Sequence, residues 1–197
     1  MDTTRPFFLL RTTLAALGIA CCMPHAATAA DGARISRDCA TPEHRQFDFW
    51  IGDWDTFEIE AAGGPSIARA RIEPVAEGCA LHERYEQTDG LVGESLLSYD
   101  PVRKHWQQTW ITNRGALMVI VGNVEDGALV LEGDVHLKDG SSVLQRITWK
   151  AERAGVRETA QLSKDRGKTW SPAFDVLFRK RAGDADRRPH SEAIRTE

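Results

Sequence analysis

From residue 47 onward, apolar and polar residues alternate along the chain in short runs, and a turn signal follows each run. Alternation with a period of two is typical of β-strands that bury one face. The runs predict strands at 54–60, 67–75, 79–87, 93–99, 105–112, 116–121, 128–137, 143–150, 156–163 and 170–179. Asp-Gly pairs at 89–90, 126–127 and 139–140 supply the positive φ that tight hairpins require.

Strands that follow one another through hairpins favour a single antiparallel up-and-down sheet. Closing that sheet into a barrel removes its exposed edges. No segment after residue 46 keeps a helical apolar period for three turns. We therefore expect an all-β fold, a single up-and-down antiparallel β-barrel of about ten strands over residues 47–181. A barrel of that size encloses room for side chains and one small ligand.

The segments on either side of the barrel differ from it in composition. An apolar stretch at 14–23 (LAALGIACCM), followed by Ala27-Thr28-Ala29, predicts a signal peptide over 1–29 and a periplasmic or secreted protein. An alternative is a lipoprotein anchored at Cys21. Residues 30–46 are expected to form an irregular lead-in, and the polar, aperiodic residues 182–197 a disordered tail.

Length and composition limit the number of domains and the kinds of binding partner that we expect. Removing 29 of the 197 residues leaves 168, which suits one domain with one core. No basic patch stands out in this acidic chain, so nucleic acid is not an expected partner. The apolar stretch at 14–23 is too short to span a bilayer, so we expect no transmembrane segment. Nothing in the sequence indicates an oligomeric state.

Two cysteines, Cys39 and Cys79, remain after the predicted signal is removed. In an oxidising compartment two such thiols are expected to form a disulfide. The alternative is a pair of free, buried thiols. The histidines show no spacing typical of metal ligands, and we expect no metal site.

The stretch FDFWIGDW at 47–54 is the most aromatic part of the chain. Such a cluster is compatible with a core plug, a ligand platform or a membrane wedge. Gly52 and Trp54 match the G-x-W signature of lipocalins and other calycins, which this stretch resembles. The resemblance implies that Trp54 closes one end of the barrel, with Arg179 from the last strand packed across its ring. Phe47, Phe49 and Trp50 would then pack beneath as a plug. A membrane wedge is disfavoured, because Cys39 and the first strand hold this segment against the barrel from both sides.

A wider set of segments resembles an uncharacterised bacterial calycin-type domain family. These segments are FDFWIGDW, EGCALHERY, YDPVRKHWQQTW, LEGD, RITW and FDVLFRK. The resemblance implies a barrel with an internal cavity and no assigned activity. The related nitrobindin-like haem barrels have glycines just after the tryptophan and a late histidine that ligates iron. Both are missing from this sequence, so we disfavour haem and expect no cofactor.

Alternation also predicts which side chains face the barrel interior. The set comprises polar and aromatic residues that resemble a small-molecule site: Glu83, Tyr85, Trp106, Gln108, Trp110 and Arg146. The inward face of strand 143–150 is ambiguous, so the inclusion of Arg146 is conditional. The leading hypothesis is a site for an apolar or amphipathic molecule. A self-satisfied Glu83–Arg146 ion pair, an enzyme with Glu83 as general acid or base, and a filled structural or interaction barrel are alternatives.

Residues 163–170 (SKDRGKTW) match the Asp-box of sialidases. Sialidases carry several copies on a propeller, which this chain is too short to build. We interpret the single copy as the turn between the last two strands.

Overall fold

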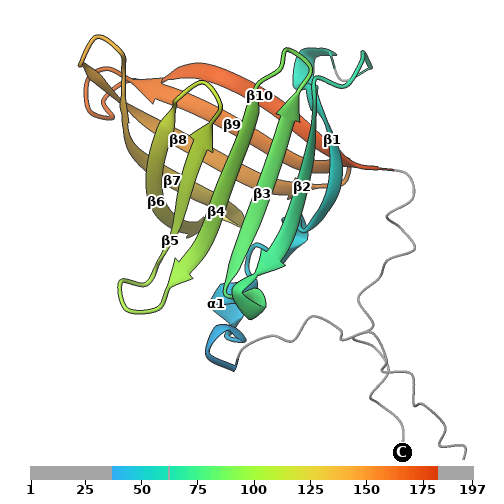
Figure 1. The fold of residues 1–197 in the computed structure, drawn as a ribbon. Coiled ribbons are helices and arrows are strands. Elements are labelled where there is room, and N and C mark those ends of the chain that lie inside the picture. The colour runs from blue at the N-terminus through green and yellow to red at the C-terminus, as the bar shows by residue number, and fades with distance from the viewer. Residues whose placement is uncertain (1–36, 62, 182–197) are drawn as a thin grey trace, which may run out of the picture. The chain divides into compact units, whose positions relative to one another are not determined.

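The computed structural model describes residues 37–61 and 63–181 and shows a closed barrel of ten antiparallel strands (Figure 1). Each strand pairs with its neighbours in sequence, and β1 closes the barrel by pairing with β10. The strands are β1 (Gly52–Glu58), β2 (Ala68–Val75), β3 (Ala80–Gln87), β4 (Val92–Asp100), β5 (His105–Thr112), β6 (Leu117–Glu125), β7 (Ala128–His136), β8 (Ser142–Glu152), β9 (Gly155–Ser163) and β10 (Ser171–Lys180). The predicted up-and-down barrel is confirmed.

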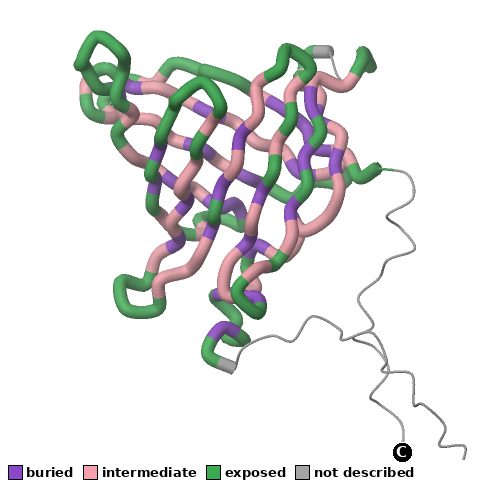
Figure 2. Tube along the Cα trace, in the orientation of Figure 1, coloured by how far each residue is buried: buried purple, intermediate pink, exposed green. Residues whose placement is uncertain are grey.

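Alternating burial along the strands accounts for this fold. Figure 2 shows buried and more exposed positions following each other along the barrel wall. In β2, for example, the first five residues alternate between buried and exposed. The hairpins turn where the Asp-Gly pairs predicted, since Gly90, Gly127 and Gly140 all have positive φ. A period of two in the sequence therefore yields one apolar inner face and one polar outer face.

The largest boundary differences lie in β1 and β6. β1 starts at Gly52 and ends at Glu58, after which Ile59–Ala61 form a 3₁₀ turn. β6 continues to Glu125, four residues beyond the predicted end. Gly52 has a φ of 140°, a conformation that favours glycine at the entry of the first strand.

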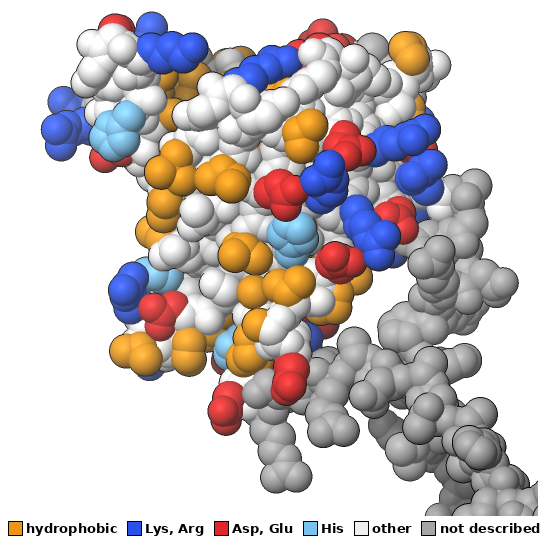
Figure 3. Space-filling view, in the orientation of Figure 1, with side chains coloured by type: hydrophobic (Ala, Val, Ile, Leu, Met, Phe, Trp, Pro, Cys, Tyr) orange, Lys and Arg blue, Asp and Glu red, His pale blue; other side chains and the backbone are white. Residues whose placement is uncertain are grey.

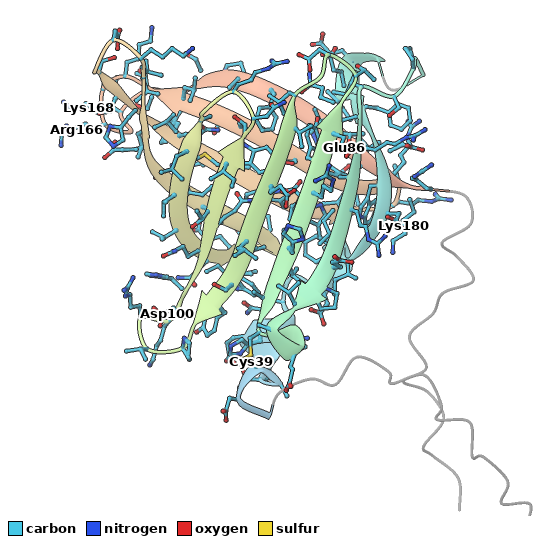
Figure 4. The ribbon with its side chains drawn as sticks, in the orientation of Figure 1. Cys39, Glu86, Asp100, Arg166, Lys168 and Lys180 are labelled. Carbon is cyan, nitrogen blue, oxygen red and sulfur yellow. A yellow bond between two sulfur atoms is a disulfide. The ribbon has the colours of Figure 1, made fainter. Side chains whose placement is uncertain are left out.

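The lead-in is more regular than expected. Its described part contains a 3₁₀ turn, Arg37–Cys39, and the one-turn helix α1, Pro42–Arg45. Proline at the first position of α1 suits a helix start, because its missing N–H has no intrahelical acceptor there. The segment is fixed to the barrel by a disulfide between Cys39 and Cys79, whose Cα atoms are 5.0 Å apart. Figure 4 shows Cys39 beside α1.

Aromatic residues of 47–50 plug this end of the barrel. Phe47 and Trp50 are fully buried, and their rings lie 5.8 and 5.9 Å from the ring of Trp149. The Phe49 ring packs edge-on against Phe47 at 4.8 Å. The indole N–H of Trp54 donates to the Trp50 carbonyl at 2.8 Å. The predicted plug is confirmed, and we call this end the plugged end.

The opposite end carries five hairpins: β1–β2, β3–β4, β5–β6, β7–β8 and β9–β10. Because the disulfide ties the lead-in to the β2–β3 turn, these hairpins lie at the end away from the plug (Figure 1). We call this the hairpin end.

The predicted signal peptide and polar tail lie outside the described residues. Within 37–61 and 63–181, no helix is both long and apolar enough to cross a membrane.

Candidate functional site

A hydrogen-bonded chain of three polar side chains lies inside the barrel. Glu83, Ser95 and Gln108 come from β3, β4 and β5, and each is 4% exposed or less. Ser95 Oγ donates to a Glu83 carboxylate oxygen at 2.9 Å, and Gln108 Nε2 donates to Ser95 Oγ at 3.2 Å. Strand register produces this chain, because Glu83 pairs directly with Ser95 across β3 and β4. The predicted inward positions of Glu83 and Gln108 agree with the structure.

Two buried polar atoms beside this chain have no hydrogen-bond partner. They are Gln108 Oε1 and the hydroxyl of Thr56, a residue that is fully buried on β1. Buried polar groups in proteins are almost always hydrogen-bonded, so each such atom requires an explanation. Both lie on inward-facing positions of their strands.

A second carboxylate, Glu158 on β9, also faces the interior and was not predicted as a site residue. Its same-face neighbours on β9, Val156 and Ala160, are 2% and 1% exposed. The register places Glu158 between Trp149 on β8 and Val176 on β10. The alternation V-R-E-T-A at 156–160 was the available signal, because it puts Glu158 on the face of the two apolar residues.

Burial shifts the protonation of both carboxylates. Loss of hydration raises the pKa of Glu83 to about 7, against a smaller lowering by the Ser95 hydrogen bond. Loss of hydration raises the pKa of Glu158 well above its usual range, and the charge of Glu83 raises it further. The nearby indole N–H of Trp149 opposes this rise. The two carboxyl groups therefore lie within electrostatic reach and titrate together.

Three inward-facing side chains, Glu158, Tyr85 and Trp110, are half-buried and not fully enclosed. Glu158 is half-buried, whereas Val156 and Ala160 on the same face of β9 are 2% and 1% exposed. Tyr85 and Trp110 are also inward-facing and partly accessible. The interior is not packed shut at these positions.

Tyr85 and Trp110 form an aromatic pair toward the hairpin end. Their ring centroids are 6.1 Å apart with an interplanar angle of 70°. The indole of Trp110 lies over Gly93, where a Cβ would come within 2.1 Å of ring carbons. Glycine at this position thus leaves room for the indole inside the barrel. Burial raises the pKa of Tyr85, and the charges of Glu158 and Glu83 add to that rise.

Trp106 lies at the plugged end and does not join the Tyr85–Trp110 pair. It is 2% exposed, its ring lies 6.2 Å from that of Phe47, and its indole N–H donates to Gln46 at 3.2 Å. Trp106 is part of an aromatic floor that closes the interior at the plugged end and that includes two residues of the plug. The other floor residues are Phe47, Trp50, Trp149 and Phe178.

Arg146 does not face the interior, and its prediction as a lumen residue is wrong. Alternating burial shows that Val143, Ile147 and Trp149 are the inward residues of β8. Arg146 lies on the outside, 2.5 Å from Glu132 and over the ring of Trp170 at 4.0 Å. Ile147 pairs with Ala160 on one side and Leu131 on the other, so the register of β7, β8 and β9 fixes this choice. The Glu83–Arg146 ion pair is also excluded.

The basic residue across Trp54 is Lys180 instead of Arg179. Lys180 pairs with Trp54 between β1 and β10, and its Nζ lies 5.0 Å from the ring centroid. Arg179 points to the other face, where its guanidinium lies 4.7 Å from the ring of Phe57. Neighbouring residues of a strand point to opposite faces, so only one of the two can cover Trp54. Figure 4 labels Lys180 near the end of β10.

The Asp-box forms the turn between β9 and β10, as predicted. Asp165 accepts hydrogen bonds from the backbone N–H and the hydroxyl of Thr169, at 2.8 and 2.6 Å. The indole N–H of Trp170 donates to the Gly167 carbonyl at 3.1 Å. Gly167 has a φ of 84°. In this barrel the motif is a structural hairpin, far from the polar chain on β3 to β5; Figure 4 labels Arg166 and Lys168 in this hairpin.

The outer surface offers weaker candidates. One shallow hollow of about 330 Å³ includes Phe49, Trp54 and Lys180, and another of about 480 Å³ lies beside Arg69 and Glu86. Both are open to solvent, and neither contains an unpartnered buried group. Figure 3 shows apolar side chains gathered on one part of the outer wall and charged pairs on another. The exposed apolar residues there lie on β4, β5 and β6: Leu96, Ile111, Leu117, Val119 and Val121.

The interior therefore has three layers along the barrel axis, in the order of residues along each strand. The aromatic floor lies next to the plug, a polar layer follows, and the Tyr85–Trp110 pair lies nearest the hairpin end. We define the polar layer as Thr56, Glu83, Ser95, Gln108 and Glu158. Over residues 37–61 and 63–181, no three metal-ligating side chains converge as a metal site would require.

No protein-family model and no curated protein matches this chain.

Proposed function

We propose that this protein binds a small amphipathic molecule inside its barrel, with the polar group of the molecule at the polar layer and its apolar part beside Tyr85 and Trp110. The observation that supports this most is the solvent-accessible Glu158 within an otherwise closed wall. Its neighbours Val156 and Ala160 on the same face are fully buried, so the accessible area at Glu158 supports room for a ligand beside it. Apolar concavities with a few fixed polar groups are the usual form of small-molecule sites.

The proposed binding role includes a calycin-like architecture and export from the cytoplasm. The ten-stranded barrel and the G-x-W entry at Gly52 and Trp54 support the first. The Cys39–Cys79 disulfide supports the second, because such bonds persist mainly in oxidising compartments. N-terminal sequencing of the exported protein tests the second. We expect the mature protein to start at Ala30; a lipid attached to Cys21 would instead show that the protein is a membrane-anchored lipoprotein.

A neutral fluorescent probe, N-phenyl-1-naphthylamine, tests binding inside the barrel. We expect saturable binding, weakened at least tenfold by Trp110→Ala. Ile111→Ala is the matched control, because Ile111 is the next residue on β5 and points outward, 52% exposed. Equal binding by both variants and the unchanged protein would refute an interior site. Mass spectrometry of small molecules that copurify with the protein then identifies the natural ligand.

A second candidate function is catalysis in the same interior. It rests on the pKa of Glu83, which at about 7 suits a general acid or base at neutral pH. Chemical conversion of a bound molecule that stops in Glu83→Gln would distinguish an enzyme from a carrier. Glu83→Gln that retains binding and shows the same conversion rate would exclude this role.

A further inference from the structure

The interior has acidic groups without matching basic ones. Two buried carboxyl groups, Glu83 and Glu158, face it from opposite parts of the barrel wall. Among the inward-facing residues of the ten described strands, the basic side chain present is Lys180. Its Nζ donates to the Ile51 carbonyl at 3.0 Å and lies over Trp54, at the plugged end. No cation of the barrel wall within the described chain is therefore placed to neutralise the polar layer.

The unpartnered atoms of the polar layer point to the same missing partner. In the ionised form of Glu83, the single Ser95 hydroxyl proton is donated to that carboxylate. Ser95 can then only accept from Gln108, so the amide must turn its NH₂ group toward Ser95 and its oxygen into the interior. Gln108 Oε1 has no donor within reach although the residue is 97% buried. The layer thus presents an unfilled acceptor, Gln108 Oε1, between two carboxyl groups, while the unpartnered indole N–H of Trp149 lies beside Glu158.

We propose that the ligand is a protonated amine on an apolar body, with its ammonium group bound between Glu83, Glu158 and Gln108 Oε1. This inference rests on the interior binding site proposed above and names the chemical class that fills it. An ammonium group has three donors and no acceptor, which complements this layer. A charge-assisted hydrogen bond to a carboxylate is also stronger than one between neutral groups.

The position of the aromatic pair limits the size of the ligand. Tyr85 lies two residues from Glu83 along β3, and Trp110 two residues from Gln108 along β5. Two residues of a strand span about 7 Å. An amine separated from an aromatic or branched apolar group by about three carbons would reach both layers. The aromatic pair would also attract the cation as it enters.

Calorimetry with three ligands that share one apolar body tests the proposal: 3-phenylpropylamine, 3-phenylpropanol and 3-phenylpropanoate. At pH 8 the amine is protonated and the propanoate is ionised. We expect the amine to bind at least tenfold more tightly than the alcohol, and the propanoate to bind more weakly than the alcohol. At pH 6, titration in buffers of different ionisation enthalpy should show proton release with the amine and none with the alcohol.

The titratable groups near the proposed ammonium site are Glu83 and Tyr85 on β3 and Glu158 on β9. Two more lie farther away: Glu58, exposed on β1, and Lys180 at the plugged end. The double variant Glu83→Gln/Glu158→Gln should lose both the amine preference and the proton release, and still bind the alcohol. Glu86→Gln, on the outer side of β3 (Figure 4), should change neither.

The outcomes separate the two proposals. Equal binding of all three ligands, or an amine preference that survives in the folded double variant, would overturn the amine inference and leave the interior site standing. No detectable binding of any of the three would overturn both. Circular dichroism confirms that the double variant is folded, which is expected because it removes two buried charges and keeps the shape of each side chain.

Discussion

Ser95 and Glu83 are joined inside the barrel by a hydrogen bond of 2.9 Å, and this bond orients the polar layer. The serine hydroxyl has one proton to donate, and the carboxylate receives it. When Glu83 is ionised, Gln108 must therefore serve Ser95 as a donor, which leaves the amide oxygen free. A neutral pair of residues on adjacent strands could satisfy itself. Here the hydrogen-bonded chain ends instead on an acceptor without a donor, and this supports an interior that receives a ligand.

The first prediction concerns pH and stability. Both carboxyl groups have a higher pKa in the folded protein than in the unfolded chain. At a pH between these two pKa values, the folded protein therefore binds more protons than the unfolded chain. The free energy of unfolding therefore falls as pH rises above about 4.5 through about 7, and the full contribution is present only below that window. We expect the ligand-free protein to lose about 3 kcal/mol from Glu83 between pH 4.5 and 8. Urea unfolding at several pH values measures it.

A matched set of variants tests whether Glu83 and Glu158 cause this pH dependence of stability. Glu83→Gln/Glu158→Gln should give a nearly flat profile across the same window, whereas Glu86→Gln should behave like the unchanged protein, because Glu86 is exposed. Stability that rises between pH 5 and 8 in the unchanged protein would contradict the assigned burial of the two carboxyl groups.

The second prediction concerns the packing of the Trp110 indole over Gly93. Gly93→Ala would place a Cβ within 2.1 Å of the indole, so the ring must move. We expect a loss of about 1–3 kcal/mol in the free energy of unfolding and a changed tryptophan fluorescence spectrum. Gly63→Ala is the control, since a Cβ there meets nothing within 4 Å. An unchanged spectrum in Gly93→Ala would show that Trp110 does not occupy this position.

The third prediction concerns the plug. Trp50 is fully buried against Trp149 and Phe178, so Trp50→Ala should lower the free energy of unfolding by about 3–5 kcal/mol. Phe174→Ala, at a residue that is 38% exposed, should have a much smaller effect. Similar losses in the two variants, measured by urea unfolding, would contradict a packed plug at 47–50.

The fourth prediction concerns the disulfide. Cys39 and Cys79 are 40 residues apart, so their bond removes much loop freedom from the unfolded chain. The chain-entropy relation gives about 4 kcal/mol for a loop of this length. Denaturation of the unchanged protein and of Cys39→Ser/Cys79→Ser, each with and without reductant, measures it. The reductant should destabilise the unchanged protein and leave the double variant unaffected; an equal response of both would contradict the prediction.

Much of the fold could be predicted because it depends on local pattern. The strand 105–112 coincides with β5, and the Asp-Gly turns lie where they were expected. One-turn helices such as α1 could not be predicted, because four residues show no apolar period and the contacts that fix them are distant in sequence. Arg45, for example, donates to the Gly78 carbonyl.

The site was predicted in part. Alternation placed Glu83, Tyr85, Gln108 and Trp110 on the inner face, because these strands have one clearly apolar side. The strand with Arg146 has apolar residues on both faces, so only its register against Leu131 and Ala160 decides the inward set. A register shift of one residue moves every side chain of a strand to the other face of the sheet.

Two further differences between the predicted and the observed site also arise from strand register. Glu158 lies on the apolar face of β9 and pairs with Trp149 across the β8–β9 hairpin, but its second neighbour, Glu83, comes from β3, which is distant in sequence. Lys180 and Arg179 are adjacent, and the choice between them depends on which one pairs with Trp54. Sequence alone gives the alternation within a strand, whereas register between strands follows from the closed barrel.

The most direct test of the interior site is an NMR titration of the isotope-labelled protein with 3-phenylpropylamine. We expect the side-chain amide of Gln108 and the indole N–H of Trp110 to shift first and saturably. Amides of the outer wall around Val119 and Val121 should stay in place. Shifts confined to that outer wall, or no shift at all up to millimolar ligand, would contradict binding inside the barrel.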